Sequence, residues 1–155
     1  MKTAGKTPHG QPNPQAHLSP LILRLGAAFV KPVLILFSFY LLSKGHNEPG
    51  GGFVGGLVAS SAFLLHLIAY DAESTRKSLP LEPHALMGIG LLFAALSGLA
   101  PLLKGESFFK GLWFDIPLWP GASFHTGTPQ IFDIGVYLVV LGTMLVIFLN
   151  LKERQ

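Results

Sequence analysis

Residues 45–57 read GHNEPGGGFVGGL and place a charged, hydrated stretch directly before five glycines at the start of an apolar run. Helices in lipid gain little by burying apolar side chains against one another, so close backbone packing has to supply their attraction. Continued as a helix, the run carries small residues four apart on two adjacent stripes, formed by Gly52, Gly56 and Ser60 and by Gly51, Gly55 and Ala59. The stretch predicts a membrane helix that admits a neighbouring backbone.

The composition is that of a membrane protein. Half of the 155 residues are hydrophobic and 12% are charged, and the mean hydropathy is +0.50. A helix that crosses the hydrocarbon layer of roughly 30 Å needs about 20 mostly apolar residues, and four runs meet this requirement without the apolar and polar alternation of a transmembrane barrel. We expect an all-α integral membrane protein with spans at residues 21–42, 53–70, 85–103 and 131–151.

The segments that flank the spans set the domain organisation and the orientation. Residues 1–20 lack the short apolar core of a secretory signal, which predicts a flexible tail that is kept. Residues 21–151 form the four-helix membrane domain, and residues 152–155 form a C-terminal tail. Four spans put both termini on one side, and the excess of lysine and arginine on that side predicts that both termini are cytoplasmic.

The connection between the third and fourth spans is long and rich in aromatic residues. One interpretation is an interfacial lid on the outer side, since aromatic rings suit the boundary between headgroups and hydrocarbon. The other is a docking surface for another subunit, since buried interfaces also favour Trp and Phe. The aromatic residues of this loop are Phe108, Phe109, Trp113, Phe114, Trp119 and Phe124.

Small residues also mark the later spans. Gly90, Ala94 and Gly98 lie four apart in the third span, and Gly135 and Gly142 lie seven apart, two turns along one face of the fourth. Helix faces lined by small residues thus occur on three of the four spans. We expect some of them to pack against other helices of this chain and others to contact other subunits.

The residues before the first glycine run fit the start of a helix. Asn47 can accept a hydrogen bond from an exposed backbone N–H as a cap, and Glu48 and Pro49 suit a first helical turn. Two roles remain open for the free N–H groups there, capping alone or the binding of an anion or an acidic side chain.

Lys31 lies halfway along the first span and is followed by Pro32. A lysine at the centre of a bilayer helix costs about 2.5 to 3.5 kcal/mol on insertion scales, so it should face protein or water, and central placement makes snorkelling difficult. Pro32 leaves the carbonyl of Ala28 without its helical donor, which predicts a kink. The preferred interpretation of Lys31 is a permanent ion pair with a carboxylate of a partner subunit, and the alternative is a polar relay.

Two further titratable residues are candidates for an ion path. His66, one turn from the end of the second span, could exchange a proton near neutral pH, although a histidine there more commonly donates one interhelical hydrogen bond. Asp133, near the start of the fourth span, either stabilises the helix N-terminus or belongs to an ion vestibule.

The sequence lacks the patterns of an active site. It has no cysteine, no metal-ligand cluster, no phosphate loop and no nucleophile triad. The basic pI of about 9.3 is explained by the charges that flank the spans, without nucleic acid. We therefore expect no enzymatic activity, no cofactor, no metal site and no nucleic-acid partner.

Two stretches resemble a known family. HNEPGGGFVGGL at residues 46–57 and GTPQIFDIGVYLVVLG at residues 127–142 closely resemble the MrpB (MnhB) component of the Mrp multisubunit sodium/proton antiporter, and the resemblance covers roughly residues 20–150. Glu48 stands where members often have a small or apolar residue. The resemblance carries over signature residues, not assigned ion ligands: Gly45, His46, Asn47, Pro49, Gly50, Gly51, Gly52, Phe53, Gly55, Gly56, Gly127, Thr128, Pro129, Asp133, Gly135 and Tyr137.

The resemblance implies an accessory subunit of a complex that exchanges sodium for protons, driven by the proton motive force, and that supports pH homeostasis in alkali and salt. It implies a multi-pass protein of the bacterial inner membrane, in contact with lipid and with other subunits, including large antiporter-like ones, and a contribution to assembly and to the path of Na⁺ and H⁺. Two alternatives remain open: a membrane-arm subunit of a hydrogenase-type redox complex, and a small stand-alone oligomeric transporter, which would be expected to carry its own central acidic residue.

Overall fold

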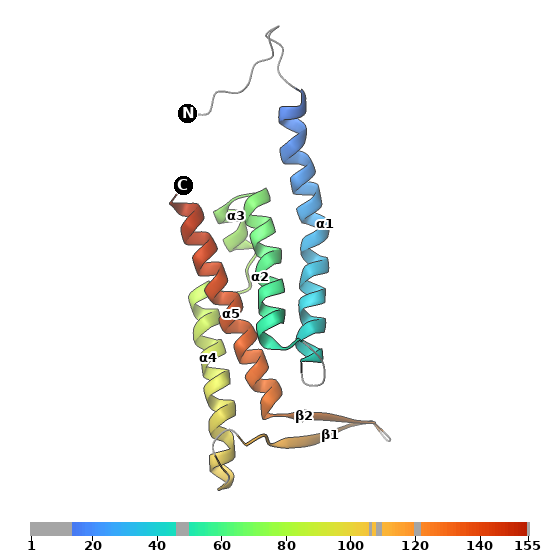
Figure 1. Ribbon diagram of the computed structural model, residues 1–155, viewed down its shortest axis with the longest axis vertical. Coiled ribbons are helices and arrows are strands. Elements are labelled where there is room, and N and C mark those ends of the chain that lie inside the picture. The colour runs from blue at the N-terminus through green and yellow to red at the C-terminus, as the bar shows by residue number, and fades with distance from the viewer. Residues whose placement is uncertain (1–13, 46–49, 106, 108–109, 120–121, 155) are drawn as a thin grey trace.

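Four long helices lie side by side in the order α1, α2, α5, α4 in the computed structural model (Figure 1). The structure describes residues 14–45, 50–105, 107, 110–119 and 122–154. Each helix packs mainly on its neighbours in this row, so α2 and α5 lie in the middle and α1 and α4 at the edges. The helices are α1 (Pro14–Lys44), α2 (Gly52–Ala69), α4 (Pro83–Leu99) and α5 (Thr128–Glu153).

The four predicted spans are confirmed. Four helical segments are long and apolar enough to cross a membrane, namely Leu21–Lys44, Gly52–Ala69, Pro83–Leu103 and Thr128–Glu153. Their bounds differ from the expected ones by three residues at most, because the apolar runs end where charged residues, glycines or prolines begin. The membrane domain is therefore helical, with one polar or turn-rich connection between each pair of spans.

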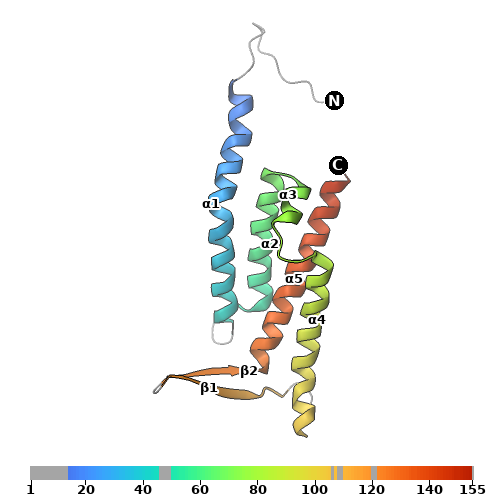
Figure 2. The same cartoon turned by 180° about the vertical axis from the view of Figure 1, so that it is seen from behind.

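The start of α1 and the end of α5 lie at the same end of the bundle, which we call the terminal end, and the opposite end is called the hairpin end (Figures 1 and 2). α1 begins at Pro14, so residues 14–20, which the sequence assigned to the flexible tail, are helical. α1 also extends beyond the other helices at the terminal end (Figure 2). It is helical through Pro32 without interruption.

A short helix, α3 (Ala72–Lys77), closes the terminal end between α2 and α4. The Asp71 side chain caps this helix by accepting a hydrogen bond from the backbone N–H of Ser74 at 2.6 Å. The guanidinium of Arg76 then donates to the Glu153 carboxylate at 2.9 Å, which ties α3 to the last turn of α5. The connection after the second span is thus an ordered, capped turn of helix.

The connection after the third span is not the plain loop that the sequence predicted. It contains a 3₁₀ helix, η1 (Ala100–Lys104), and an antiparallel hairpin of β1 (Trp113–Trp119) and β2 (Ala122–Gly127). Residues that favour strands fill both arms, and Pro117 is tolerated because each strand of a two-stranded sheet is an edge strand. The hairpin runs across the end of the bundle toward the side of α1 (Figures 1 and 2).

The two stripes of small residues on α2 face two different helices. A Cβ atom at Gly52 would collide with the backbone carbonyl of Asp133, and one at Gly56 would lie 2.9 Å from the carbonyl oxygen of Tyr137, both on α5. A Cβ atom at Gly55 would lie 2.9 Å from the carbonyl oxygen of Ser38 on α1. The predicted close approach of a neighbouring backbone is therefore confirmed, and it occurs on two sides at once.

The small residues of the last two spans serve the same purpose within the chain. Gly90 of α4 and Gly135 of α5 meet, since a Cβ atom at either position would lie 2.6 to 2.7 Å from the carbonyl oxygen of the other. A Cβ atom at Gly142 would lie 2.7 Å from the carbonyl oxygen of Pro83. We expected some of these glycines to contact other subunits. Gly90, Gly135 and Gly142 do not support this expectation, because α4 and α5 of the same chain already pack against them.

We predict that replacing Gly90 with alanine lowers the stability of the solubilised protein by about 1 to 3 kcal/mol, because α4 and α5 would have to separate. Gly88, two residues earlier in the same helix, is the matched control, since a Cβ atom there meets nothing within 4 Å. Its alanine variant should be neutral, or more stable by up to about 1 kcal/mol through helix propensity. Unfolding in detergent micelles measures both; equal effects would contradict the packing assigned to Gly90.

Candidate functional site

The two sequence motifs that carry the family resemblance come together at the hairpin end. The N–H of Gly51 donates to the carbonyl of Leu41 at 3.1 Å, so the chain turns sharply between α1 and α2. Gly51 has a φ of 92°, a backbone conformation that side chains with a Cβ rarely adopt. The Asp133 carboxylate lies against this turn, with Oδ2 3.3 Å from a Cβ position at Gly45 and 3.5 Å from one at Gly51.

A cavity of about 360 Å³ opens beside this contact. Its described lining comes from the end of α1, from α4, from the segment before the hairpin and from the start of α5. The hydroxyl groups of Ser97 and Thr128 and the carboxylate of Asp133 are its polar side-chain groups among the described lining residues. The lining residues are Gly45, Ser97, Gly111, Thr128, Pro129, Phe132 and Asp133.

Thr128 holds the wall of this cavity in place. Its N–H donates to the carbonyl of Leu112 at 3.0 Å, and its hydroxyl accepts from the N–H of Leu112 at 3.1 Å. These two bonds fix the segment before the hairpin to the first turn of α5. Pro129 follows at a position in the first turn where the absence of an N–H leaves no helical hydrogen bond unmade.

A buried pair of hydroxyl groups links α1 to α5 on the terminal side of the cavity. Ser38, which is fully buried, donates to the carbonyl of Ile35 at 2.7 Å and shares a 3.1 Å hydrogen bond with the Tyr137 hydroxyl. The Tyr137 ring stacks on Phe39, with ring centroids 6.0 Å apart. The sequence reasoning missed Ser38, because a single serine within an apolar run carries no spacing pattern that would mark it.

Lys31 lies away from the cavity, near the terminal end. Its ammonium donates to the hydroxyl of Ser78 at 3.1 Å and lies 4.8 Å from the centre of the Phe63 ring. The ammonium therefore reaches a residue outside the four apolar spans, although the central placement of Lys31 in its span predicted that this would be difficult. Because α1 extends past the other helices, the middle of α1 lies level with the connection that carries Ser78.

His66 also lies toward the terminal end, and its ring packs on Tyr70 with centroids 4.5 Å apart. Tyr70 in turn contacts Arg24, whose guanidinium carbon lies 5.6 Å from the Tyr70 ring centre. The structure thus brings Lys31 and His66 to the same end of the bundle and places Asp133 at the other end.

Two helices begin at other residues than expected. α2 begins at Gly52 with Gly51 as its N-cap, and the expected cap, Asn47, lies outside the described residues. α5 begins at Thr128 with Gly127 as its N-cap. Asp133 therefore lies in the second turn, beyond the range in which a carboxylate stabilises a helix N-terminus strongly.

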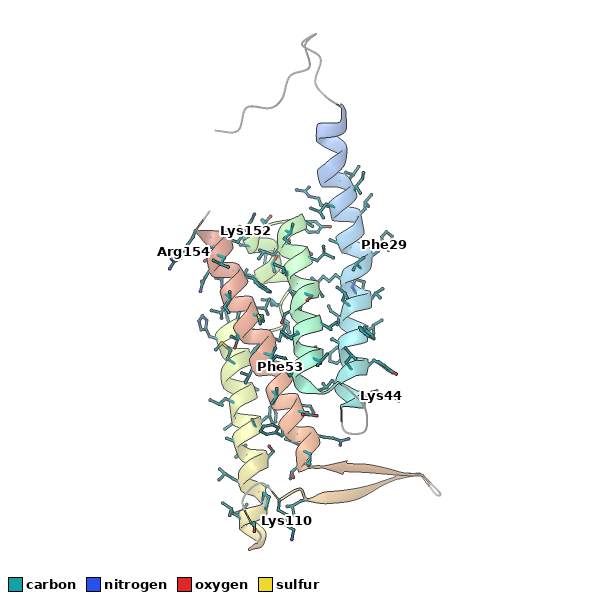
Figure 3. The ribbon with its side chains drawn as sticks, in the orientation of Figure 1. Phe29, Lys44, Phe53, Lys110, Lys152 and Arg154 are labelled. Carbon is teal, nitrogen blue, oxygen red and sulfur yellow. The ribbon has the colours of Figure 1, made fainter. Side chains whose placement is uncertain are left out.

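The remaining motif residues divide between packing and exposure. A Cβ atom at Gly50 would lie 2.8 Å from the carbonyl of Leu41, and Phe53 is 57% exposed on the outside of α2 (Figure 3). His46, Asn47 and Pro49 lie outside the described residues, as do Phe108, Phe109 and the first 13 residues of the predicted tail. Within the described part of the chain, no group of three His, Cys, Asp or Glu side chains is placed to hold a metal ion.

The sequence as a whole matches one family. Residues 22–146 match the family described as a domain related to the MnhB subunit of the Na⁺/H⁺ antiporter. The chain belongs to this family. It is 42% identical over 137 residues to the B-type subunit of the Na⁺/H⁺ antiporter from Bacillus subtilis (strain 168), with 87% of this chain and 94% of the relative covered. It is 38% identical over 123 residues to the relative of the same name from Alkalihalophilus pseudofirmus, with 78% and 84% covered.

The fold also matches a solved structure. The whole chain superposes on part of one chain in the structure of the Mrp complex from Dietzia sp. DQ12-45-1b, with a TM-score of 0.76 and 27% sequence identity. This chain spans 16% of that much longer chain. The family and its four-helix fold therefore agree with the resemblance read from the two motifs.

We predict that replacing Tyr137 with phenylalanine destabilises the protein by about 0.6 kcal/mol, a typical value for a hydrogen bond between membrane helices. The stacking on Phe39 would remain, and only the bond to Ser38 would be lost. Tyr40 is the matched control, since it is 54% exposed on α1, and its phenylalanine variant should be neutral. Unfolding in micelles compares the two; an equal loss for Tyr40 would contradict the role of the buried pair.

Proposed function

We propose that the chain is an accessory membrane subunit of a multisubunit monovalent cation/proton antiporter that exchanges Na⁺ for H⁺ under the proton motive force. The observation that carries the proposal is the match to the Na⁺/H⁺ antiporter protein of Bacillus subtilis, at 42% identity over 94% of that protein. The protein would be a multi-pass protein of the bacterial inner membrane, with both termini in the cytoplasm, since the terminal end carries the larger share of Lys and Arg.

The apolar interior of the bundle supports an accessory role rather than a transport role for the chain alone. Proton-coupled transporters carry ionisable residues inside the membrane, whereas the packed core here consists of Ala59, Phe63, Leu86, Tyr137, Leu141 and Leu145. Asp133 lies at the hairpin end, beside the cavity, rather than within this core. The chain alone therefore offers no continuous polar route through its described core, and we infer that it performs no enzymatic chemistry of its own.

Partner subunits are proposed to cover part of the outer surface, and lipid the rest. α1 contacts the bundle almost only through α2, and its outer face exposes large apolar side chains, with Phe29 74%, Val33 63% and Leu36 71% exposed (Figure 3). In the Dietzia complex the matching fold forms 16% of one long chain. This supports a place for the chain beside larger, antiporter-like membrane subunits.

The three titratable candidates are proposed to have different roles. Asp133, with the hydroxyl groups of Ser97 and Thr128 on the same cavity wall, is the proposed contribution of this chain to the ion path. Lys31 is proposed to pair with a carboxylate of a partner subunit, because its described partners are a hydroxyl and an aromatic ring, neither of which neutralises its charge. His66, packed on Tyr70, is proposed to be structural.

The proposed function is tested in a bacterial strain that lacks the gene for this chain but keeps the other antiporter genes. Everted membrane vesicles of that strain should lose the collapse of the pH gradient on addition of Na⁺, and expression of the chain should restore it. Purification in mild detergent should recover the large antiporter-like subunits with the chain. Recovery with redox subunits, or Na⁺/H⁺ exchange by the chain alone in liposomes, would contradict the proposal.

Lys31 and Asp133 should separate assembly from transport. Replacing Lys31 with alanine should lower the amount of assembled complex and transport together, because an unpaired partner carboxylate costs several kcal/mol inside a membrane protein. Replacing Asp133 with asparagine, which keeps its shape, should leave assembly intact and lower the exchange rate. Lys77→Ala is the control, since Lys77 forms an exposed pair with Glu73. Assembled Lys31→Ala complex without transport would instead support a relay.

A further inference from the structure

A groove of about 190 Å³ lies between the last turns of α2 and α5 at the terminal end. Leu64, Leu67 and Ile68 line it from α2, and Phe148, Leu151 and Lys152 line it from α5. Its walls are accessible from outside, since Ile68 is 57% and Leu151 is 59% exposed. The groove is open to the surroundings of the bundle and is unrelated to the cavity beside Asp133 at the other end.

The groove lies at the ends of two apolar spans. The span of α2 ends at Ala69 and that of α5 at Glu153, which predicts that the groove lies near the boundary between hydrocarbon and headgroups. Five apolar side chains form the walls, and Lys152 lies at the end of α5 (Figure 3). The groove is therefore apolar along its walls and cationic at its end. This matches a phospholipid, whose acyl chain is apolar and whose anionic headgroup would pair with the lysine.

Lys152 is the charged residue among the described residues that line the groove. The Glu153 carboxylate is already held by Arg76 at 2.9 Å, and the guanidinium of Arg24 donates to the carbonyl of Ala69 at 3.3 Å, which offsets the negative end of α2. Lys152 and Arg154 are in the last residues of the described chain, and neither has a carboxylate partner among the described residues. A phosphate group would complement them.

The walls favour an acyl chain over another helix. Helices associate in membranes through small residues that let backbones approach, but the closely packed glycines of α2 and α5 do not line the groove and are covered by the chain's own helices. The groove walls carry Leu, Ile and Phe. Bulky walls keep a second backbone at a distance, whereas a thin and flexible hydrocarbon chain can lie along them.

We propose that this groove is a binding site for an anionic phospholipid, with one acyl chain between α2 and α5 and the phosphate at Lys152. The lipid covers apolar surface that the protein leaves open, and its phosphate pairs with the ammonium of Lys152. It also anchors the last turn of α5 at a fixed depth in the inner leaflet.

The test uses the full chain, purified from membranes with whatever subunits accompany it, and native mass spectrometry after addition of phosphatidylglycerol or phosphatidylcholine of equal acyl length. The wild type should retain phosphatidylglycerol in preference to phosphatidylcholine. Lys152→Gln should weaken phosphatidylglycerol binding roughly fivefold and leave phosphatidylcholine unaffected. Lys77→Gln, which removes the same charge from α3 at the same end of the bundle, should bind as the wild type does.

A second variant tests the groove itself. Ile68→Trp fills the space between the two helices and should reduce the retention of both lipids while the accompanying subunits stay bound. Equal phosphatidylglycerol binding by the wild type and Lys152→Gln would overturn the proposal. So would an Ile68→Trp variant that keeps its lipid but loses a subunit, because a polypeptide would then occupy the groove. Neither outcome depends on which complex the chain belongs to.

Discussion

The structure depends on the approach of the α2 backbone to two neighbours at once. Gly52 and Gly56 bring α2 against the backbone of α5, and Gly55 brings it against α1, at distances where a Cβ atom would collide. In lipid, such contacts replace the hydrophobic driving force that holds soluble helices together. The rest of the row follows from this, because α5 in turn meets α4 through Gly135 and Gly90. Each helical glycine costs roughly 1 kcal/mol relative to alanine, and the close packing of three helix pairs offsets that cost.

The spans and the packing role of the glycines were predictable from the sequence, because both depend on local composition and spacing. Which helix each small face meets was not predictable, since it depends on the order of the helices in the row. The start of α2 was placed too early because the positive φ of Gly51 is a tertiary feature, set by the bond of its N–H to Leu41. The hairpin at residues 113–127 was not predicted, because the glycines, prolines and isolated charges of this connection also fit an irregular loop at the membrane interface.

The candidate site likewise combines motifs that the sequence reveals with contacts that only the fold creates. The two motifs were recognisable separately, but only the fold places Asp133 against the turn at Gly45 and Gly51 and beside a cavity. The contact between the Lys31 ammonium and Ser78 was not predictable, because it depends on how the helices are arranged. α1 extends past its neighbours, which brings its middle close to the connection that carries Ser78 (Figure 1). Ser38 escaped notice because a lone serine in an apolar run has no pattern of its own.

The order of the helices in the row differs from their order along the chain, and this has a consequence for biogenesis. α1 and α2 are neighbours in both, so they can pair as soon as they leave the translocation channel. The other side of α2 belongs to α5, the last helix to be synthesised. During synthesis the Gly52 and Gly56 stripe therefore faces lipid until α4 and α5 have entered the membrane. A nascent chain released early would expose this stripe as an adhesive surface for foreign helices.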